Sequence, residues 1–268
     1  MKAAFTIIYL LTIVSSLLAQ GDTAFRLIKS YPGEISDAAI DNLDNVYILT
    51  ATNQLKKYNS KGDSLAVYNN VRSFGKVSSI DVSNPLKVLL YYKDFSSIVI
   101  LDRLLGVRST IDLRERNILG VSAIGQSYDN RIWVFDAYDN KLKKIDDEGR
   151  LLLETPDLRM VFKGAVTPQQ IIDNNKQVYL YDTASGVFIF DNYGSFKRKI
   201  PITGWSHINI TDKHILGIAD RSMQDYNVTT LLQSAQKFPG NFTPYYQYHI
   251  SNNKLLALSK EGLHIYRY

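Results

Sequence analysis

A repeated pattern of short strands and tight turns constrains this sequence more than any other feature. The pattern is clearest at residues 131–154, where the apolar run 132–135 is followed by Asp136, a second strand over 141–145 and a turn that ends in Gly149. Short Asp and Asn side chains bond to nearby backbone groups, and Gly adopts positive φ, so such clusters form hairpin turns. The stretch therefore predicts three consecutive antiparallel strands.

Copies of this pattern recur before and after it. They begin near Asn45, Lys87 and Gln177, and each has a Gly at the matching turn, at Gly62, Gly106 and Gly194. A period of roughly 40 to 50 residues with four strands per unit is typical of β-propeller blades. The sequence therefore predicts an all-β, six-bladed β-propeller. Its four-stranded antiparallel blades lie at about 34–70, 76–113, 120–156, 167–202, 204–240 and 244–268.

The last predicted unit has only three strands. An isolated strand at residues 24–30 precedes the first unit and has no partner of its own. Pairing these two closes the ring and leaves no exposed sheet edge at the junction. We therefore expect one propeller domain over residues 20–268, closed by an N-terminal strand that completes the last blade.

The segments that follow Val46, Ile132 and Val178 resemble NHL-type repeats of six-bladed propellers. Each has an apolar strand, a tight turn, a mixed strand and punctuation by acidic residues and Gly. The resemblance implies the fold over most of the chain. It also implies a binding platform of the kind found in exported bacterial propellers, or, as in some relatives of similar shape, a metal-dependent lactonase or related hydrolase.

The N-terminal residues predict export. Lys2 precedes an apolar run over residues 5–18 that is short for a membrane span, so residues 1–19 are expected to be a signal peptide. An uncleaved signal anchor is the alternative. The chain has no cysteine, which excludes disulfides and thiolate metal sites. These features favour a periplasmic or outer-membrane-associated bacterial protein, with an extracellular location as the alternative.

The charged residues do not predict binding to nucleic acid. The formal net charge is +5 at pH 7, but Lys and Arg are interspersed with acidic residues. No basic run with interleaved aromatic residues occurs. Outside the predicted signal peptide, no second hydrophobic span occurs, so no transmembrane segment is expected after cleavage.

No catalytic motif stands out. Asp136, Asp182 and Asp220 follow equivalent strands, where a carboxylate is expected to accept backbone N–H groups of a turn rather than to bind metal. His207 and His249 fall on predicted innermost strands and could line the central channel, as metal ligands, as an acid and base, or as polar residues in a wet channel. The last interpretation is preferred, and no cofactor or metal is expected.

The connectors between blades provide the candidate binding surface. They should gather on one rim together with the turns between second and third strands. Arg and aromatic residues, which protein interfaces concentrate, occur there. The candidates are Arg114, Arg116, Tyr138, Arg159, Phe162, Lys163, Trp205, Arg221 and Tyr245.

The sequence therefore favours a non-enzymatic scaffold that binds a protein partner, as an accessory subunit of a bacterial envelope complex. Two alternatives stay open. One is a secreted hydrolase, lyase or lactonase-like enzyme with a site at the channel mouth near His207 and His249. The other is a glycan-binding module, which would need an aromatic platform around Trp205 and Tyr245.

Overall fold

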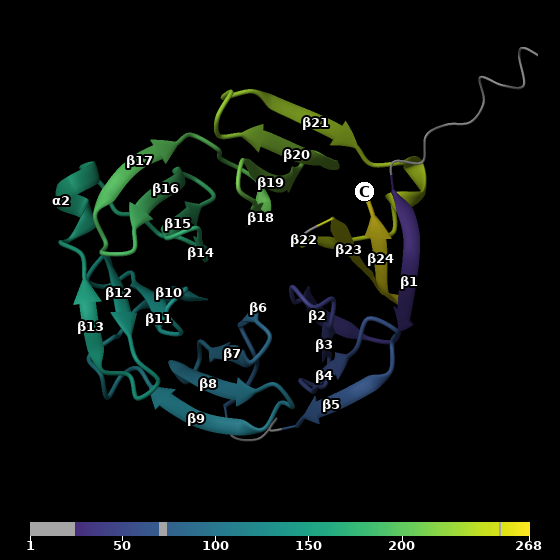
Figure 1. The fold of residues 1–268 in the computed structure, drawn as a ribbon, viewed down its shortest axis with the longest axis horizontal. Coiled ribbons are helices and arrows are strands. Elements are labelled where there is room, and N and C mark those ends of the chain that lie inside the picture. The colour runs from purple at the N-terminus through teal and green to yellow at the C-terminus, as the bar shows by residue number, and fades with distance from the viewer. Residues whose placement is uncertain (1–24, 70–73, 252) are drawn as a thin grey trace, which may run out of the picture.

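The computed structural model describes residues 25–69, 74–251 and 253–268, so the predicted signal peptide lies outside the described residues. These residues form six four-stranded antiparallel sheets arranged as blades around a ring (Figure 1). The six-bladed propeller is confirmed. The innermost strands are β2 (Ile35–Ile40), β6 (Ser79–Asn84), β10 (Val121–Gln126), β14 (Gln170–Asn174), β18 (Ser206–Ile210) and β22 (Gln247–Ser251).

The second and third strands of each blade carry most of the core. The second strands are β3 (Val46–Thr50), β7 (Lys87–Tyr92), β11 (Ile132–Asp136), β15 (Gln177–Asp182), β19 (His214–Ala219) and β23 (Lys254–Ser259). The third strands are β4 (Leu55–Tyr58), β8 (Ser97–Asp102), β12 (Lys141–Ile145), β16 (Gly186–Asp191), β20 (Ser222–Asn227) and β24 (Gly262–Arg267). Every residue of β7, β11 and β23 is buried, as expected for strands covered on both faces.

The outermost strands are more exposed and face the rim of the ring. They are β5 (Ser64–Tyr68), β9 (Val107–Asp112), β13 (Leu151–Glu154), β17 (Phe196–Ile200), β21 (Gln233–Lys237) and, in the last blade, β1 (Arg26–Pro32). Blade five, the least regular in sequence, also has a fourth strand, β21.

Ring closure by the N-terminal strand is confirmed. β1 pairs with β24 in antiparallel register, with Arg26 opposite Arg267 and Pro32 opposite Gly262. The strand begins two residues later than the predicted range 24–30. Gly262 is required at this junction, because its φ is +148° and an added Cβ would lie 2.1 Å from the carbonyl oxygen of Tyr31.

The hydrophobic core is divided among the junctions between blades. Each of six buried clusters draws its residues from two successive blades. The cluster between blades three and four, for example, packs Trp133 and Phe135 against Leu180 and Phe188. Because each blade is flat and buries both faces, neighbouring blades stabilise one another around the ring.

The connector between blades three and four contains a helix that the sequence analysis did not predict. Helix α2 (Leu158–Phe162) is capped by Asp157, whose carboxylate accepts from the Arg159 N–H at 2.9 Å, and ends at Lys163 in the left-handed conformation. A 3₁₀ helix, η1 (Gly240–Phe242), precedes blade six. In the part of the chain that the structure describes, no helix is long and apolar enough to cross a membrane.

Candidate functional site

Backbone hydrogen bonds place the blade connectors beside the turns between second and third strands. In blade two, the Leu113 N–H donates to the Ser96 carbonyl at 2.9 Å. In blade three, the Ala137 N–H donates to the Gly120 carbonyl at 2.7 Å. The predicted common rim is therefore present, and we call it the connector face.

Six of the nine candidate connector residues are exposed. They are Arg114, Arg116, Tyr138, Arg159, Lys163 and Arg221. Tyr138 is the most open of the candidate aromatics, with 70% of its surface exposed. Two of the arginines are held by local bonds: Arg114 Nη2 donates to the Asp94 carbonyl at 2.8 Å, and Arg159 forms a salt bridge with Asp157 at 2.7 Å.

The three remaining candidates serve the core instead. Trp205 is 4% exposed and packs in the cluster between blades four and five, and the Tyr181 hydroxyl donates to its carbonyl at 2.7 Å. Phe162 packs on Phe188, and Tyr245 packs in the cluster between blades five and six. The aromatic platform that glycan binding would need around Trp205 and Tyr245 is therefore not formed, because burying an indole ring stabilises the protein more than exposing it.

The aspartates after the second strands differ in their roles. Asp136 accepts from the Gly120 and Tyr138 N–H groups at 3.1 Å, and Asp182 accepts from the Thr167 N–H at 3.0 Å, so both fasten turns as expected. Asp220 is exposed, has φ of 49°, and forms no hydrogen bond among the described residues. The turn role was wrong for Asp220, whose contribution is the left-handed backbone that Asp tolerates.

Helix α2 presents apolar side chains that the sequence analysis missed. Met160 is 83% exposed and Val161 is 46% exposed at the outer edge of the ring, where α2 lies beside β17 (Figure 1). Next to them is a groove of about 300 Å³ between the end of β13, α2 and the β16–β17 turn. Its walls include Val161, Tyr193 and Phe196, and Tyr193 is 74% exposed.

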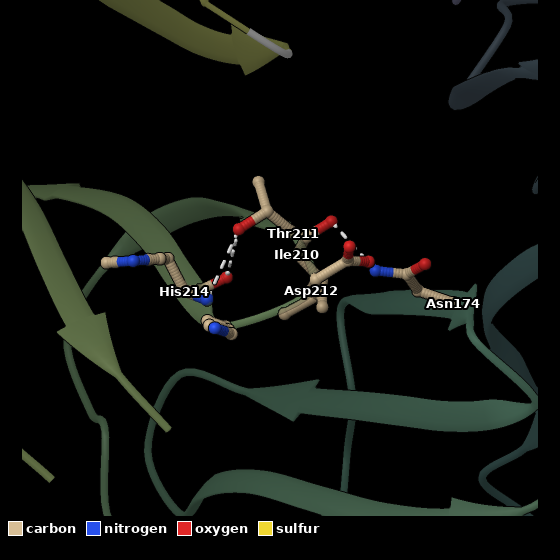
Figure 2. A pocket seen from close by; sticks show the side chains of 6 residues that line it. Asn174, Ile210, Thr211, Asp212 and His214 are labelled. Atoms are coloured by element: carbon tan, nitrogen blue, oxygen red, sulfur yellow. Dashed lines mark hydrogen bonds between the residues drawn. The ribbon is translucent and has the colours of Figure 1, made fainter. Parts of the chain in front are cut away.

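A second hollow of about 480 Å³ opens at the turns β14–β15 and β18–β19, which lie on the face opposite the connectors. Figure 2 shows its lining, in which the Asn174 amide donates to the Ile210 carbonyl and Thr211 bonds with the backbone of His214. The His214 ring bonds to Asp225 at 2.7 Å. These polar groups form hydrogen bonds with one another. The hollow is therefore formed by turns whose polar groups already have hydrogen-bond partners.

The two channel candidates lie together between the innermost strands. His207 on β18 and His249 on β22 have ring centroids 4.1 Å apart. His249 Nε2 lies 2.9 Å from Asp37 Oδ1 on β2, so residues of blades five, six and one meet here. Gln247 joins the group, with its amide nitrogen 2.8 Å from the same Nε2. Sequence reasoning missed Asp37, because only ring closure brings β2 beside β22, and it also missed Gln247, which lies two residues before His249 on the same strand.

Electrostatics set the charge of His207 and of Asp37 near neutral pH. Burial, followed by the proximity of His249, lowers the pKa of His207 to about 4, so its imidazole is neutral. Burial acts to raise the pKa of Asp37, but the hydrogen bond from His249 and its charge outweigh this, and the pKa of Asp37 is lowered. Asp37 is therefore a carboxylate that can only accept hydrogen bonds.

The backbone at His207 is irregular. The pairing of β18 with β19 shifts between Ser206 and Ile208, which makes His207 the extra residue of a β-bulge, and its φ is 47°. Equivalent bulges occur at Ser36 and Ser122, but neither of those residues has positive φ. Bulges re-aim side chains, and positive φ in a non-glycine residue is a sign of local strain. Here the bulge turns an imidazole toward His249.

No group of three or more His, Cys, Asp or Glu side chains in the described part of the chain is arranged to hold a metal ion.

Comparison with known proteins identifies the architecture. No protein-family model matches the chain, and no curated protein is similar to it in sequence. Among solved structures, a streptogramin B lyase is 12% identical, with a TM-score of 0.60 over 86% of this chain and 78% of that one. The WD40 domain of Neurospora crassa Pan2 is 12% identical, with a TM-score of 0.62 over 91% of this chain and 82% of that one.

A catalytically inactive histidine variant of virginiamycin B lyase from Staphylococcus aureus, solved with quinupristin, is 14% identical. Its TM-score is 0.58 over 91% of this chain and 87% of that one. At these identities the likeness shows the fold alone, and the NHL repeat type stays a prediction. The chain is thus a six-bladed β-propeller whose fold is shared by lyases and WD40 domains.

Proposed function

We propose that this protein is an exported, non-enzymatic propeller that binds a protein partner, as an accessory subunit of a bacterial envelope complex. The observation that carries this proposal is the exposed apolar surface at α2. Met160 on α2 is 83% exposed, and Val161 of the same helix is 46% exposed and lines the groove together with Tyr193 and Phe196. Exposed apolar patches rimmed by polar residues mark interaction sites on soluble proteins.

The chemistry of this surface suggests what the partner presents. An apolar side chain of the partner could fill the groove, and burial of Met160 would contribute about 1.5–3 kcal/mol. The acidic groups at the rim are already neutralised, Glu154 by Lys141 at 2.6 Å and Asp157 by Arg159 at 2.7 Å. Lys163 is exposed and forms no ion pair among the described residues. We therefore expect an apolar anchor flanked by acidic residues.

Site-specific crosslinking in the native cells tests the proposal. A photoreactive amino acid replaces Tyr193, and a matched control replaces Leu104, which is 59% exposed at the equivalent β8–β9 turn of blade two. We expect one discrete adduct from position 193 and none from position 104. Val161→Glu should abolish the adduct at 193, because Val161 lines the groove and a charge there would be desolvated by the partner. Identical adducts at both positions, or recovery of a lone monomer, would contradict the proposal.

The export component is supported by the sequence of residues 1–19 and has its own test. N-terminal sequencing of the protein purified from native cells should begin after Ala19. Recovery of the chain with residue 2 intact in the soluble cytoplasmic fraction would contradict export without affecting the docking surface.

A further inference from the structure

Exposed leucines project from the turns on the face opposite the connectors, which we call the turn face. It consists of the turns that join first to second strands and third to fourth strands. Among the described residues, five leucines of these turns are each at least 59% exposed. They lie in blades one, two and five and are Leu43, Leu86, Leu104, Leu231 and Leu232. Each would gain free energy from any partner that removes it from water.

The backbone at three of these leucines is fixed by side chains of the same turn. The N–H groups of Leu43, Leu86 and Leu104 each donate to the side-chain oxygen of an Asp or Asn two residues earlier, at 2.9, 3.0 and 2.7 Å. Such Asx turns stabilise the local chain, while the leucine side chain stays in solvent. Contact with a partner would therefore need little ordering of the backbone.

The β20–β21 turn presents two adjacent leucines. Leu231 is 63% exposed and Leu232 is 70% exposed, and Leu231 has a φ of 62°, which a leucine seldom adopts. Asn227 holds this turn, because its carbonyl accepts from the Leu231 N–H at 2.8 Å and its N–H donates to the Leu232 carbonyl at 2.9 Å. These hydrogen bonds hold both leucines in solvent in a conformation that leucine disfavours.

Acidic residues of the turn face are partly neutralised from inside the protein. Three of them pair with buried lysines, in the pairs Asp44–Lys254, Asp129–Lys144 and Asp147–Lys87. Three others, Asp63, Asp102 and Asp212, have no cationic partner among the described residues and accept hydrogen bonds from asparagine amides or turn N–H groups.

Exposed cations of the same turns remain free. Within the described part of the chain, five exposed side chains of these turns form no ion pair and no hydrogen bond. They are Lys61, Arg103, Arg131, Lys176 and Lys213. Because these five cations outnumber the three acids without a cationic partner, the free charge of the turn face is positive, which suits an anionic surface.

A lipid surface fits this arrangement better than a protein does. The leucines stand on separate turns spread around the ring (Figure 1), whereas the anchor residues of protein interfaces fill pockets. The hollow at His214 on this face is lined by polar groups that already have hydrogen-bond partners. A bilayer can receive all the turns at once, with apolar side chains at the acyl boundary and cations at the phosphates.

We propose that the turn face docks this protein on a membrane surface that contains anionic phospholipids, with the five leucines at the boundary between headgroups and acyl chains. The free Lys and Arg side chains contact the phosphates. This peripheral binding goes beyond the proposed partner binding and rests on different residues. Tyr193 of blade four also lies on this face, but it lines the groove beside α2 and is left unchanged in the experiments.

Co-sedimentation with lipid vesicles tests the proposal. The protein is the chain from Gln20, which contains every strand of the ring and lacks the predicted signal peptide. We expect binding to vesicles of phosphatidylethanolamine and phosphatidylglycerol, and much weaker binding to vesicles of phosphatidylcholine alone. Equal binding to both kinds of vesicle, or no binding to the anionic vesicles, would overturn the proposal.

Replacing the paired leucines tests the apolar contacts. Leu231→Asn, which tolerates the positive φ, combined with Leu232→Ser should lower the affinity for the anionic vesicles at least about tenfold, because apolar burial is lost. Leu119→Ser is the matched control, since Leu119 is 57% exposed on the connector face, and it should leave the affinity unchanged. Unchanged binding by the double variant would show that the leucines do not insert.

Replacing two free lysines tests the electrostatic contacts. Lys176 and Lys213 lie on neighbouring turns, which the Asn175 amide joins by a 2.6 Å hydrogen bond to Asp212. Lys176→Gln combined with Lys213→Gln should weaken binding to the anionic vesicles, and added salt should weaken wild-type binding as well. Insensitivity to both changes would contradict the role of the phosphates.

Fluorescence of Leu232→Trp locates the turn directly. Phospholipids brominated on their acyl chains should quench this tryptophan, whereas they should not quench the tryptophan of Leu119→Trp. The native Trp133 and Trp205 are buried and give the same background in both variants. Equal quenching at positions 232 and 119 would overturn the insertion. A protein adduct formed from position 232 in native cells, without vesicle binding, would assign the face to a protein partner instead and overturn the proposal.

Discussion

The ammonium group of Lys87 on β7 donates a 2.7 Å hydrogen bond to the backbone carbonyl of Asn130 in the next blade. Lys87 is 3% exposed and also pairs with Asp147 of that blade. Lys57 reaches the Arg103 carbonyl at 2.9 Å in the same manner. Such lysines cross the apolar junctions and fix how one blade sits on its neighbour.

Lys87→Met should lower the free energy of unfolding by about 1–3 kcal/mol, because the Asn130 carbonyl and the Asp147 carboxylate would lose their partner. Urea unfolding followed by circular dichroism measures the change. Lys61→Met is the control, since Lys61 is exposed and forms no bond among the described residues. Equal midpoints for the two variants would show that the contact between blades adds nothing.

Gly262→Ala should destabilise the ring closure strongly, although the substitution adds only one methyl group. The new Cβ would meet the Tyr31 carbonyl oxygen at 2.1 Å and the Pro32 Cα at 3.0 Å, so β1 would have to shift along its length. A loss of about 2 kcal/mol or more is expected from the clash and the positive φ together. Gly164→Ala meets nothing within 4 Å and should be neutral. Thermal unfolding of both variants tests this prediction. Deletion of residues 25–32 should lower the melting temperature more than either substitution.

His207 should make stability depend on pH above the range where carboxylates titrate. Its pKa is lowered from 6.5 to about 4, so as pH falls through this window the unfolded state takes up a proton before the folded state does. Stability present above pH 6.5 is therefore lost toward pH 4. Solvent screening at this partly open site reduces the loss to about 1–3 kcal/mol.

The groups that face His207 are His249 and Asp37. The lowered pKa of Asp37 acts only below its ordinary value of 3.8, so it does not account for the window above pH 4. Melting temperatures measured from pH 7.5 to pH 4.5 should fall less in His207→Asn than in the wild type. Parallel curves for the two proteins would contradict the assignment.

Trp205→Ala should cost about 3–5 kcal/mol, as for other fully packed aromatic side chains. The indole ring fills the space above Gly217, where an added Cβ would lie 2.4 Å from it. Tyr138→Ala is the exposed control and should change the free energy of unfolding by less than about 0.5 kcal/mol. The midpoints of denaturant unfolding, measured for both variants, test this prediction. If Trp205→Ala lowered the free energy of unfolding as little as Tyr138→Ala, the indole would not be part of the core, and the assignment would be wrong.

The architecture could be predicted because its signals are local. Turns such as the one at Asp136 are encoded within a few residues, and the strand count of the last unit required the closure by β1. The burial of the aromatic residues in the connectors could not be predicted in this way. Trp205 and Tyr245 were expected at the surface because connectors usually are, and only the packing between blades shows that the rings turn inward.

The candidate sites were predicted only in part for a related reason. His207 and His249 could be placed on innermost strands by their position in the repeat. Their partner Asp37 could not be predicted, since it is 210 residues from Gln247 of the same cluster and meets it only across the closed ring. Helix α2 has five residues, too few for a periodic apolar pattern, so Val161 and the groove that it lines gave no signal in the sequence.

Closure by β1 also sets the order of events when the chain folds. The strand at Arg26–Pro32 is made before the other strands of the ring, whereas its partner at Gly262–Arg267 is made after them. During synthesis β1 has no native partner, and the last blade offers an open edge of the kind that recruits other chains. Contacts so distant in sequence form slowly. A chain kept unfolded until it is complete would avoid this exposure, whereas folding during synthesis would prolong it.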